Sequence, residues 1–128
     1  MKTILVDAVG TFVIEGKEVY QPMFDLLEQY SNRKIILTNA NDEQMISFGL
    51  TNLPYEIFTL KHNPDKTDSA YFYQFLTQFN LRASDVVYFE HNPDAVSSAQ
   101  SVGISSFFYD PDKKDMNSLK SFLDKNLG

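Results

Sequence analysis

The chain has 128 residues, with 11 Lys and Arg against 17 Asp and Glu, and a formal net charge of −6 at pH 7. This length fits one domain spanning residues 1–128, and the acidic balance argues against nucleic acid or an anionic membrane surface as the main partner. The sequence has no cysteine, which excludes a disulfide scaffold, a thiol nucleophile and a thiolate metal site. No apolar run approaches the roughly 20 residues of a membrane span, and the N-terminal segment lacks the features of a signal peptide, so we expect a cytoplasmic protein.

The chain opens with a short apolar run at 3–6, which predicts a strand buried on both faces. Gly10 breaks the apolar pattern after it. Residues 11–19 are rich in β-forming side chains, with Gly16 at the expected turn, and predict a short flap. Pro22 then suits the first turn of a helix, because its missing N–H has no partner at that position.

The middle of the chain continues the alternation of strands and helices. A second buried strand is predicted at 34–38, and Asn41 can cap the helix that follows it. A third strand is expected at 55–60. The next helix begins at Thr67 or Asp68, and its large apolar side chains recur at helical spacing.

The last part of the chain repeats the pattern. We expect a fourth strand at 85–89, a helix at 93–102 with Gly103 at its exit, a fifth strand at 104–109 and a closing helix at 116–127. Strands that alternate with helices imply a parallel sheet joined by right-handed crossovers. The sequence therefore predicts a Rossmann-like α/β domain with a five-stranded parallel sheet and helices on both faces.

In open α/β sheets, ligands bind beyond the carboxyl ends of the strands. The chemistry-bearing side chains expected at this edge are Asp7, Thr38, Asn39, Lys66, Glu90, His91 and Asn92. Such a group suits a phosphate, because Asp7 could attack phosphorus while Thr38 and Lys66 hold its non-bridging oxygens. A cation between Asp7 and Glu90 would lower the repulsion between carboxylate and phosphoryl group. His62 lies further away, and we give it little weight.

Four short motifs stand on these elements in a fixed order. They are Asp-Ala-Val-Gly-Thr at 7–11, Thr-Asn-Ala at 38–40, Lys-Thr-Asp at 66–68, and Glu-His-Asn at 90–92 before a helix and Gly103. In order and spacing they resemble the haloacid dehalogenase superfamily of aspartate-nucleophile hydrolases. The resemblance covers nearly the whole chain, and it implies the same α/β fold.

The resemblance implies a role for each position. The nucleophile is Asp7, the phosphate- or anion-binding residues are Thr38, Asn39 and Lys66, and the ligands of a divalent cation are Asp7, Val9 (through its backbone carbonyl), Glu90 and His91. Val9 stands where the family's general acid/base usually stands, and it cannot move a proton. His91 replaces an acidic Mg²⁺ ligand, and imidazole suits Mn²⁺ or another transition metal better than Mg²⁺. We expect Mg²⁺ first and a transition metal second, and His91 could instead take the metal's place as a cation.

The first motif also resembles a second branch of the superfamily. Dehalogenases of this superfamily carry Asp-Ala-Tyr-Gly-Thr there and need no metal, and residues 7–11 match that run at four of five positions. However, Glu90 and His91 replace the two serines of their fourth motif. The gaps that flank Thr38 are also too short for the cap domain that supplies their halide pocket, so a domain without a cap is expected.

Three functions follow in order of preference. The first is a weak or specialised phosphomonoester phosphatase acting on a small phosphorylated molecule. The second is a catalytically impaired binding or regulatory domain with a protein partner, motivated by Val9 and His91. The third is a dehalogenase-like hydrolase. The aromatic runs at 71–73 and 107–109 exceed what one small face buries, so a homo-oligomer is a secondary expectation.

Overall fold

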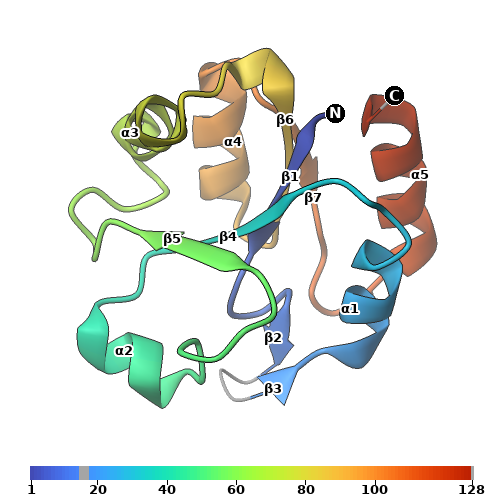
Figure 1. The fold of residues 1–128 in the computed structure, drawn as a ribbon, viewed down its shortest axis with the longest axis horizontal. Helices are drawn as coiled ribbons and strands as arrows, with labels where there is room; N and C mark the ends of the chain where they lie inside the picture. Colours follow the sequence, from blue (N-terminus) through green and yellow to red (C-terminus); the bar gives the residue numbers. More distant parts are fainter. Residues whose placement is uncertain (15–17, 128) are drawn as a thin grey trace.

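Residues 1–14 and 18–127 are described in the computed structural model, so the turn expected at Gly16 lies outside the described residues (Figure 1). A five-stranded parallel sheet has the order β5-β4-β1-β6-β7. Its strands are β1 (Thr3–Asp7), β4 (Lys34–Thr38), β5 (Glu56–Thr59), β6 (Val86–Glu90) and β7 (Ser105–Phe108). At the predicted flap, β2 (Val13–Ile14) pairs antiparallel with β3 (Glu18–Val19).

Helices cover both faces of the sheet (Figure 1). The helices are α1 (Gln21–Leu27), α2 (Asp42–Ser47), α3 (Ser69–Phe79), α4 (Pro93–Ser101) and α5 (Met116–Leu127). α1 and α5 pack on one face and α3 and α4 on the other, while α2 follows the carboxyl end of β4. The predicted fold class is confirmed. In the described part of the chain, the segments between β1 and β4 and between β4 and β5 hold only short elements and no cap domain.

The central strand β1 contributes to both layers of the core, because successive side chains of a strand point to opposite faces of the sheet. Ile4 and Val6 belong to the cluster that includes Leu119 of α5. Leu5 belongs to the other cluster, with Phe72 of α3. All five side chains are fully buried. This packing fixes β1 rigidly, so the residue that ends it, Asp7, is held at a defined place on the sheet edge.

The fourth strand begins one residue later than predicted. Asp85 belongs to a 3₁₀ turn (Ala83–Asp85), and its carboxylate accepts a hydrogen bond from the backbone N–H of Arg82 at 2.8 Å. The side chain here closes back on an N–H three residues earlier, as in a capping box, which favours a turn over a strand. The strand also ends one residue later than predicted, because Glu90 still pairs with Phe108 of β7, and the Glu90 side chain is buried.

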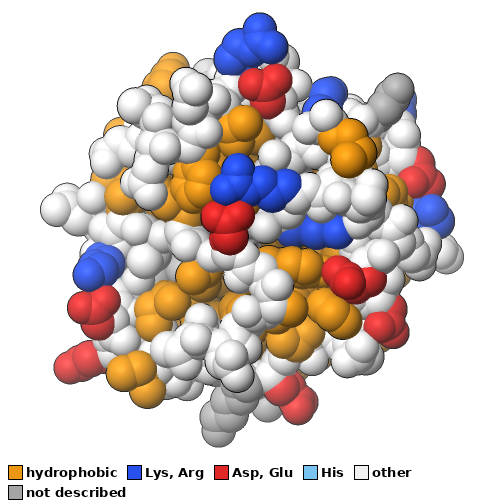
Figure 2. Space-filling view, viewed as in Figure 1, with side chains coloured by type: hydrophobic (Ala, Val, Ile, Leu, Met, Phe, Trp, Pro, Cys, Tyr) orange, Lys and Arg blue, Asp and Glu red, His pale blue; other side chains and the backbone are white. Residues whose placement is uncertain are grey.

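The described surface is mixed in character. Figure 2 shows Lys and Arg side chains interspersed with acidic and apolar ones on the face it presents. Among the exposed ion pairs of the described residues, Arg33 contacts Glu56 at 2.8 Å. Of the aromatic runs, Tyr71 is buried, whereas Tyr73 is 58% and Phe108 46% exposed. A homo-oligomer therefore stays a prediction. None of the described helices has the length and apolar character needed to cross a bilayer.

Candidate active site

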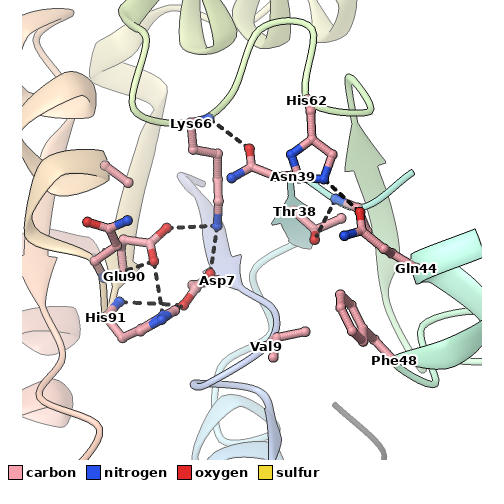
Figure 3. A pocket seen from close by; sticks show the side chains of 13 residues that line it. Asp7, Val9, Thr38, Asn39, Gln44, Phe48, His62, Lys66, Glu90 and His91 are labelled. Carbon is pink, nitrogen blue, oxygen red and sulfur yellow. Dashed lines mark hydrogen bonds and ion pairs between the residues drawn. The ribbon is translucent and has the colours of Figure 1, made fainter. Parts of the chain in front are cut away.

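A cavity of about 220 Å³ opens at the carboxyl edge of the sheet (Figure 3). The residues predicted for the site all line it: Asp7, Val9, Thr38, Asn39, Lys66, Glu90, His91 and Asn92. They come from the ends of β1, β4 and β6 and from the segment before α3. The parallel topology brings these segments to one place, as the sequence predicted.

The ammonium group of Lys66 lies between two carboxylates. Its Nζ donates to Asp7 Oδ1 at 2.6 Å, to Glu90 Oε1 at 2.8 Å and to the backbone oxygen of Leu37 at 3.2 Å. The side chains of Lys66, Asp7 and Glu90 are 7%, 2% and 1% exposed. A buried ion pair must be fully hydrogen-bonded to offset its desolvation cost, and these three contacts meet that need.

His91 joins the same two carboxylates on their other oxygens. Its Nδ1 contacts Asp7 Oδ2 and lies 3.2 Å from Glu90 Oε2, and its backbone N–H donates to Asp7 Oδ2 at 3.4 Å. The ring packs so closely on Gly10 that a Cβ there would lie 3.1 Å from it. Gly10 also has φ of +91°, a conformation that favours glycine. This glycine of the first motif therefore provides the space for the imidazole.

The charges of this cluster reinforce one another. Burial raises the pKa of Asp7, but the charge of Lys66 and the hydrogen bond from His91 outweigh it and hold that pKa well below its usual range. Burial lowers the pKa of Lys66, yet the carboxylates of Asp7 and Glu90 outweigh it and raise that pKa above its ordinary value. Hydrogen bonds to Asp7 and Glu90 raise the pKa of His91 from 6.5 to about 10. Lys66 and His91 thus both carry positive charge beside the ionised Asp7 at neutral pH.

The raised pKa of His91 makes the stability of the metal-free protein depend on pH. Because its pKa is higher in the folded than in the unfolded chain, the stabilisation is complete below pH 6.5 and is lost as the pH rises through about 10. Over this range, the free energy of unfolding should fall more steeply for the wild-type protein than for His91→Asn. Urea denaturation at about pH 6.5 and about pH 10 measures the free energy of unfolding of both proteins. An equal fall in that free energy for wild-type protein and His91→Asn would contradict the expectation.

Two buried hydroxyl groups that the sequence reasoning missed complete the cluster. Thr11 donates from Oγ1 to Asp7 Oδ2 at 2.7 Å, and the Tyr88 hydroxyl donates to Glu90 Oε1. The Gly-Thr pair of the first motif was a usable signal for Thr11. Tyr88 lies in the interior of a buried strand, where its aromatic ring predicts only core packing. Together with Lys66 and His91, these hydroxyl groups fix the orientation of the two carboxylates.

The two residues predicted at the end of β4 are placed differently. Thr38 Oγ1 accepts a hydrogen bond from the backbone N–H of Ala40 at 3.2 Å. The hydroxyl group of Thr38 can still donate its own hydrogen to an anion. Asn39 Oδ1 accepts from the backbone N–H of Lys66 at 2.7 Å. Any contact of Asn39 with an anion would therefore use its Nδ2, and its Oδ1 instead positions Lys66.

The opposite wall of the cavity consists of Gln44, Phe48 and His62 (Figure 3). Asn41 caps α2 as predicted: its Oδ1 accepts from the Gln44 N–H at 2.9 Å, and Gln44 Oε1 accepts from the Asn41 N–H at 3.0 Å. This capping box fixes the Gln44 side chain. The Asn-x-x-Gln pattern was the signal that could have placed Gln44 here.

Asp7, Glu90 and His91 also form a donor set for a metal ion, with ligand atoms within 4.8 Å of one another. Two carboxylates and one imidazole fit a borderline cation such as Mn²⁺, Fe²⁺ or Zn²⁺ better than Mg²⁺. The donor set therefore fits a divalent cation. Val9 lines the cavity, and the contribution of its carbonyl stays a prediction.

No protein-family model matches the sequence, and no curated protein matches it either. Solved structures do match in fold. An uncharacterised protein from Corynebacterium glutamicum superposes with a TM-score of 0.66 at 16% identity, over 97% of this chain and 96% of its own. A HAD (haloacid dehalogenase) family enzyme from Bacteroides thetaiotaomicron, an aspartate-to-alanine mutant in complex with magnesium and inorganic phosphate, superposes with a TM-score of 0.62 at 12% identity, over 84% and 93%.

A longer protein matches as well. The UTR4 protein from Saccharomyces cerevisiae superposes with a TM-score of 0.56 at 20% identity, over 72% of this chain. The match spans about half of that protein, at 47% of its length. These likenesses, together with the topology and the strand-end residues, show that the chain has the haloacid dehalogenase-like fold. The family resemblance of the four motifs is confirmed at the level of that fold.

Proposed function

We propose that the chain is a phosphomonoester hydrolase of this fold, acting through an aspartyl-phosphate on Asp7. One observation carries the proposal: an ionised Asp7, the cation of Lys66 and the hydroxyl of Thr38 line a single cavity. The Bacteroides enzyme with bound magnesium and inorganic phosphate supports phosphate as the ligand. A cavity of about 220 Å³ suits a small phosphorylated molecule, as a cytoplasmic metabolite would be.

The proposed reaction begins with Asp7. A carboxylate oxygen forms a bond to phosphorus while the bond from phosphorus to the leaving-group oxygen breaks, and the two oxygens lie in line with phosphorus. Lys66 and Thr38 hold the non-bridging oxygens as charge develops on them. The oxygen of a water molecule then bonds to phosphorus while the bond from phosphorus to Asp7 breaks, so inorganic phosphate leaves and the Asp7 carboxylate is restored.

The charge balance of the cluster favours a further cation. Lys66 and His91 already face Asp7 and Glu90, so a phosphate dianion would meet no surplus of positive charge. Asp7, Glu90 and His91, with the carbonyl of Val9, would hold a divalent cation, and His91 would become a ligand only on losing the proton that makes it a cation. When bound, such a cation neutralises phosphoryl oxygens. We propose Mg²⁺ or, because of the imidazole, Mn²⁺.

The proposal is tested by phosphate release from a panel of phosphomonoesters in the presence of Mg²⁺ or Mn²⁺, with Asp7→Asn as the control. Turnover that depends on both the metal and Asp7 supports it. Silence across the panel would contradict it and would favour the second candidate.

The second candidate is an impaired domain that binds an anion without hydrolysing an ester. The observation that favours it is that both oxygens of the Asp7 carboxylate already have hydrogen-bond partners. Lys66 contacts Oδ1, and His91 and Thr11 contact Oδ2. The apolar side chain of Val9 also faces the cavity (Figure 3).

A double substitution separates the two candidates. Val9→Asp with His91→Asp installs an acid/base group and an oxygen ligand, and general acid/base help is worth roughly 10²–10⁴ in rate. If the chain is an impaired domain, phosphate release should appear only in the double variant. A wild-type protein that already turns over at about 1 s⁻¹ or faster would exclude the impaired domain.

A further inference from the structure

The cavity carries an imidazole on the wall opposite the carboxylates. His62 belongs to the segment between β5 and α3, and its ring lies across the cavity from Asp7 (Figure 3). Its Nδ1 lies 2.8 Å from Asp65 Oδ1, and its Nε2 lies 2.6 Å from Gln44 Oε1. The ring is therefore held from both sides.

The hydrogen bonds of the neighbours decide which ring atoms donate. Gln44 Oε1 also accepts from the backbone N–H of Asn41 at 3.0 Å, so the atom that faces His62 is an oxygen and His62 Nε2 donates to it. Nδ1 faces the carboxylate of Asp65 at 2.8 Å, and this contact orients the ring. His62 thus lines the cavity with an Nε2–H that Gln44 Oε1 accepts, and a leaving-group oxygen would have to take the place of Gln44 to receive that proton.

The protonated groups of the other wall, Lys66 and His91, are bonded to Asp7 itself and so lie on the side of the attacking carboxylate. Val9 is apolar, the Lys66 ammonium is held by two carboxylates, and His91 Nδ1 faces Asp7 and Glu90. In an in-line displacement, the leaving-group oxygen points away from the attacking carboxylate. An ester attacked by Asp7 would therefore direct its leaving group toward the wall that holds His62.

We propose that His62 is the general acid that protonates the leaving-group oxygen, and that Asp65 is the residue that positions it; this inference rests on the proposed function. As the bond from phosphorus to the leaving oxygen breaks, that oxygen takes the proton of His62 Nε2 and departs as an alcohol. Water then enters from the same side and gives a proton to Nε2. Its oxygen bonds to phosphorus, and the phosphorus–Asp7 bond breaks, so phosphate leaves and both side chains are restored.

Leaving-group dependence tests this role. p-Nitrophenyl phosphate releases a stable phenolate that needs no proton, whereas glycerol phosphate releases an alkoxide that does. We expect His62→Asn to lower kcat/KM by about 10²-fold or more on glycerol phosphate and by less than about 5-fold on p-nitrophenyl phosphate. Asp65→Asn should also lower kcat/KM more on glycerol phosphate than on p-nitrophenyl phosphate, but both losses should be smaller than those of His62→Asn.

Lys61→Asn is the matched control, because Lys61 precedes His62, shares its left-handed backbone and pairs with exposed Asp42. It should leave both rates unchanged. Equal losses on the two substrates in His62→Asn, or no loss, would overturn the role of His62 while leaving the proposed function standing. So would a wild-type protein that hydrolyses only the aryl ester. If the wild-type protein shows no Asp7-dependent release from either substrate, the proposed function fails, and the role of His62 with it.

Discussion

Asp7→Asn should lower the rate of phosphate release by at least about 10⁴-fold, because the neutral amide is a poor nucleophile and removal of a covalent nucleophile has effects of this size. The substitution keeps the shape of the side chain but removes the charge that faces Lys66 and His91. Steady-state phosphate release with saturating metal measures the effect, using the substrate on which the wild-type protein is fastest.

The control is the same chemical change at a carboxylate outside the cavity. Asp94 is exposed in the first turn of α4, and Asp94→Asn should retain the wild-type rate. A second readout is mass spectrometry of peptides from acid-quenched reactions, in which the phosphoryl group should be found on the peptide that contains Asp7. Equal rates for wild-type protein and Asp7→Asn would trace the activity to a contaminant and contradict the proposal.

The fold could be predicted from the sequence because the three central strands, β1, β4 and β6, are mainly apolar runs and the helices between strands carry their own signals. The edge residues Asp7, Thr38 and Glu90 were predictable for the same reason, since parallel strands that alternate with helices bring their carboxyl ends to one edge. Lys66 was placed by its motif. The catalytic and binding roles assigned to these residues stay predictions until the experiments above are done.

The contacts between side chains were not predictable in the same way. Lys61 and His62, which precede the turn into the cavity, both adopt positive φ, at 54° and 65°. Histidine tolerates that conformation better than most residues, but lysine carries no signal for it, so two such residues in a row were not predictable. The engagement of the Thr38 oxygen depends on the backbone of Ala40 after the strand. The junction at Asp85 was decided by a side-chain bond to a neighbouring N–H, which competes with strand formation over a single residue.

Lys66→Met should have the largest effect on stability, lowering the free energy of unfolding at pH 7 by about 3–5 kcal/mol. Methionine fills a similar volume but leaves the carboxylates of Asp7 and Glu90 facing each other in the interior, where both are almost fully buried. Breaking a buried pair by removing one partner costs more than the pair itself contributes, because an uncompensated charge remains. Urea denaturation of the metal-free protein, followed by circular dichroism, measures the change.

Two companion variants separate this electrostatic cause from a general loss of packing. Lys61→Met removes a lysine whose ion pair with Asp42 is exposed, and it should cost no more than about 1 kcal/mol. Adding Asp7→Asn to Lys66→Met removes one of the two facing charges, so the double variant should regain part of the lost stability. Lowering the pH to about 5 should act in the same direction, because one carboxylate can then take up a proton. If the double variant is instead less stable than Lys66→Met by the full cost of Asp7→Asn alone, the two side chains are energetically independent, and the balance of charge around Lys66 does not stabilise the sheet edge.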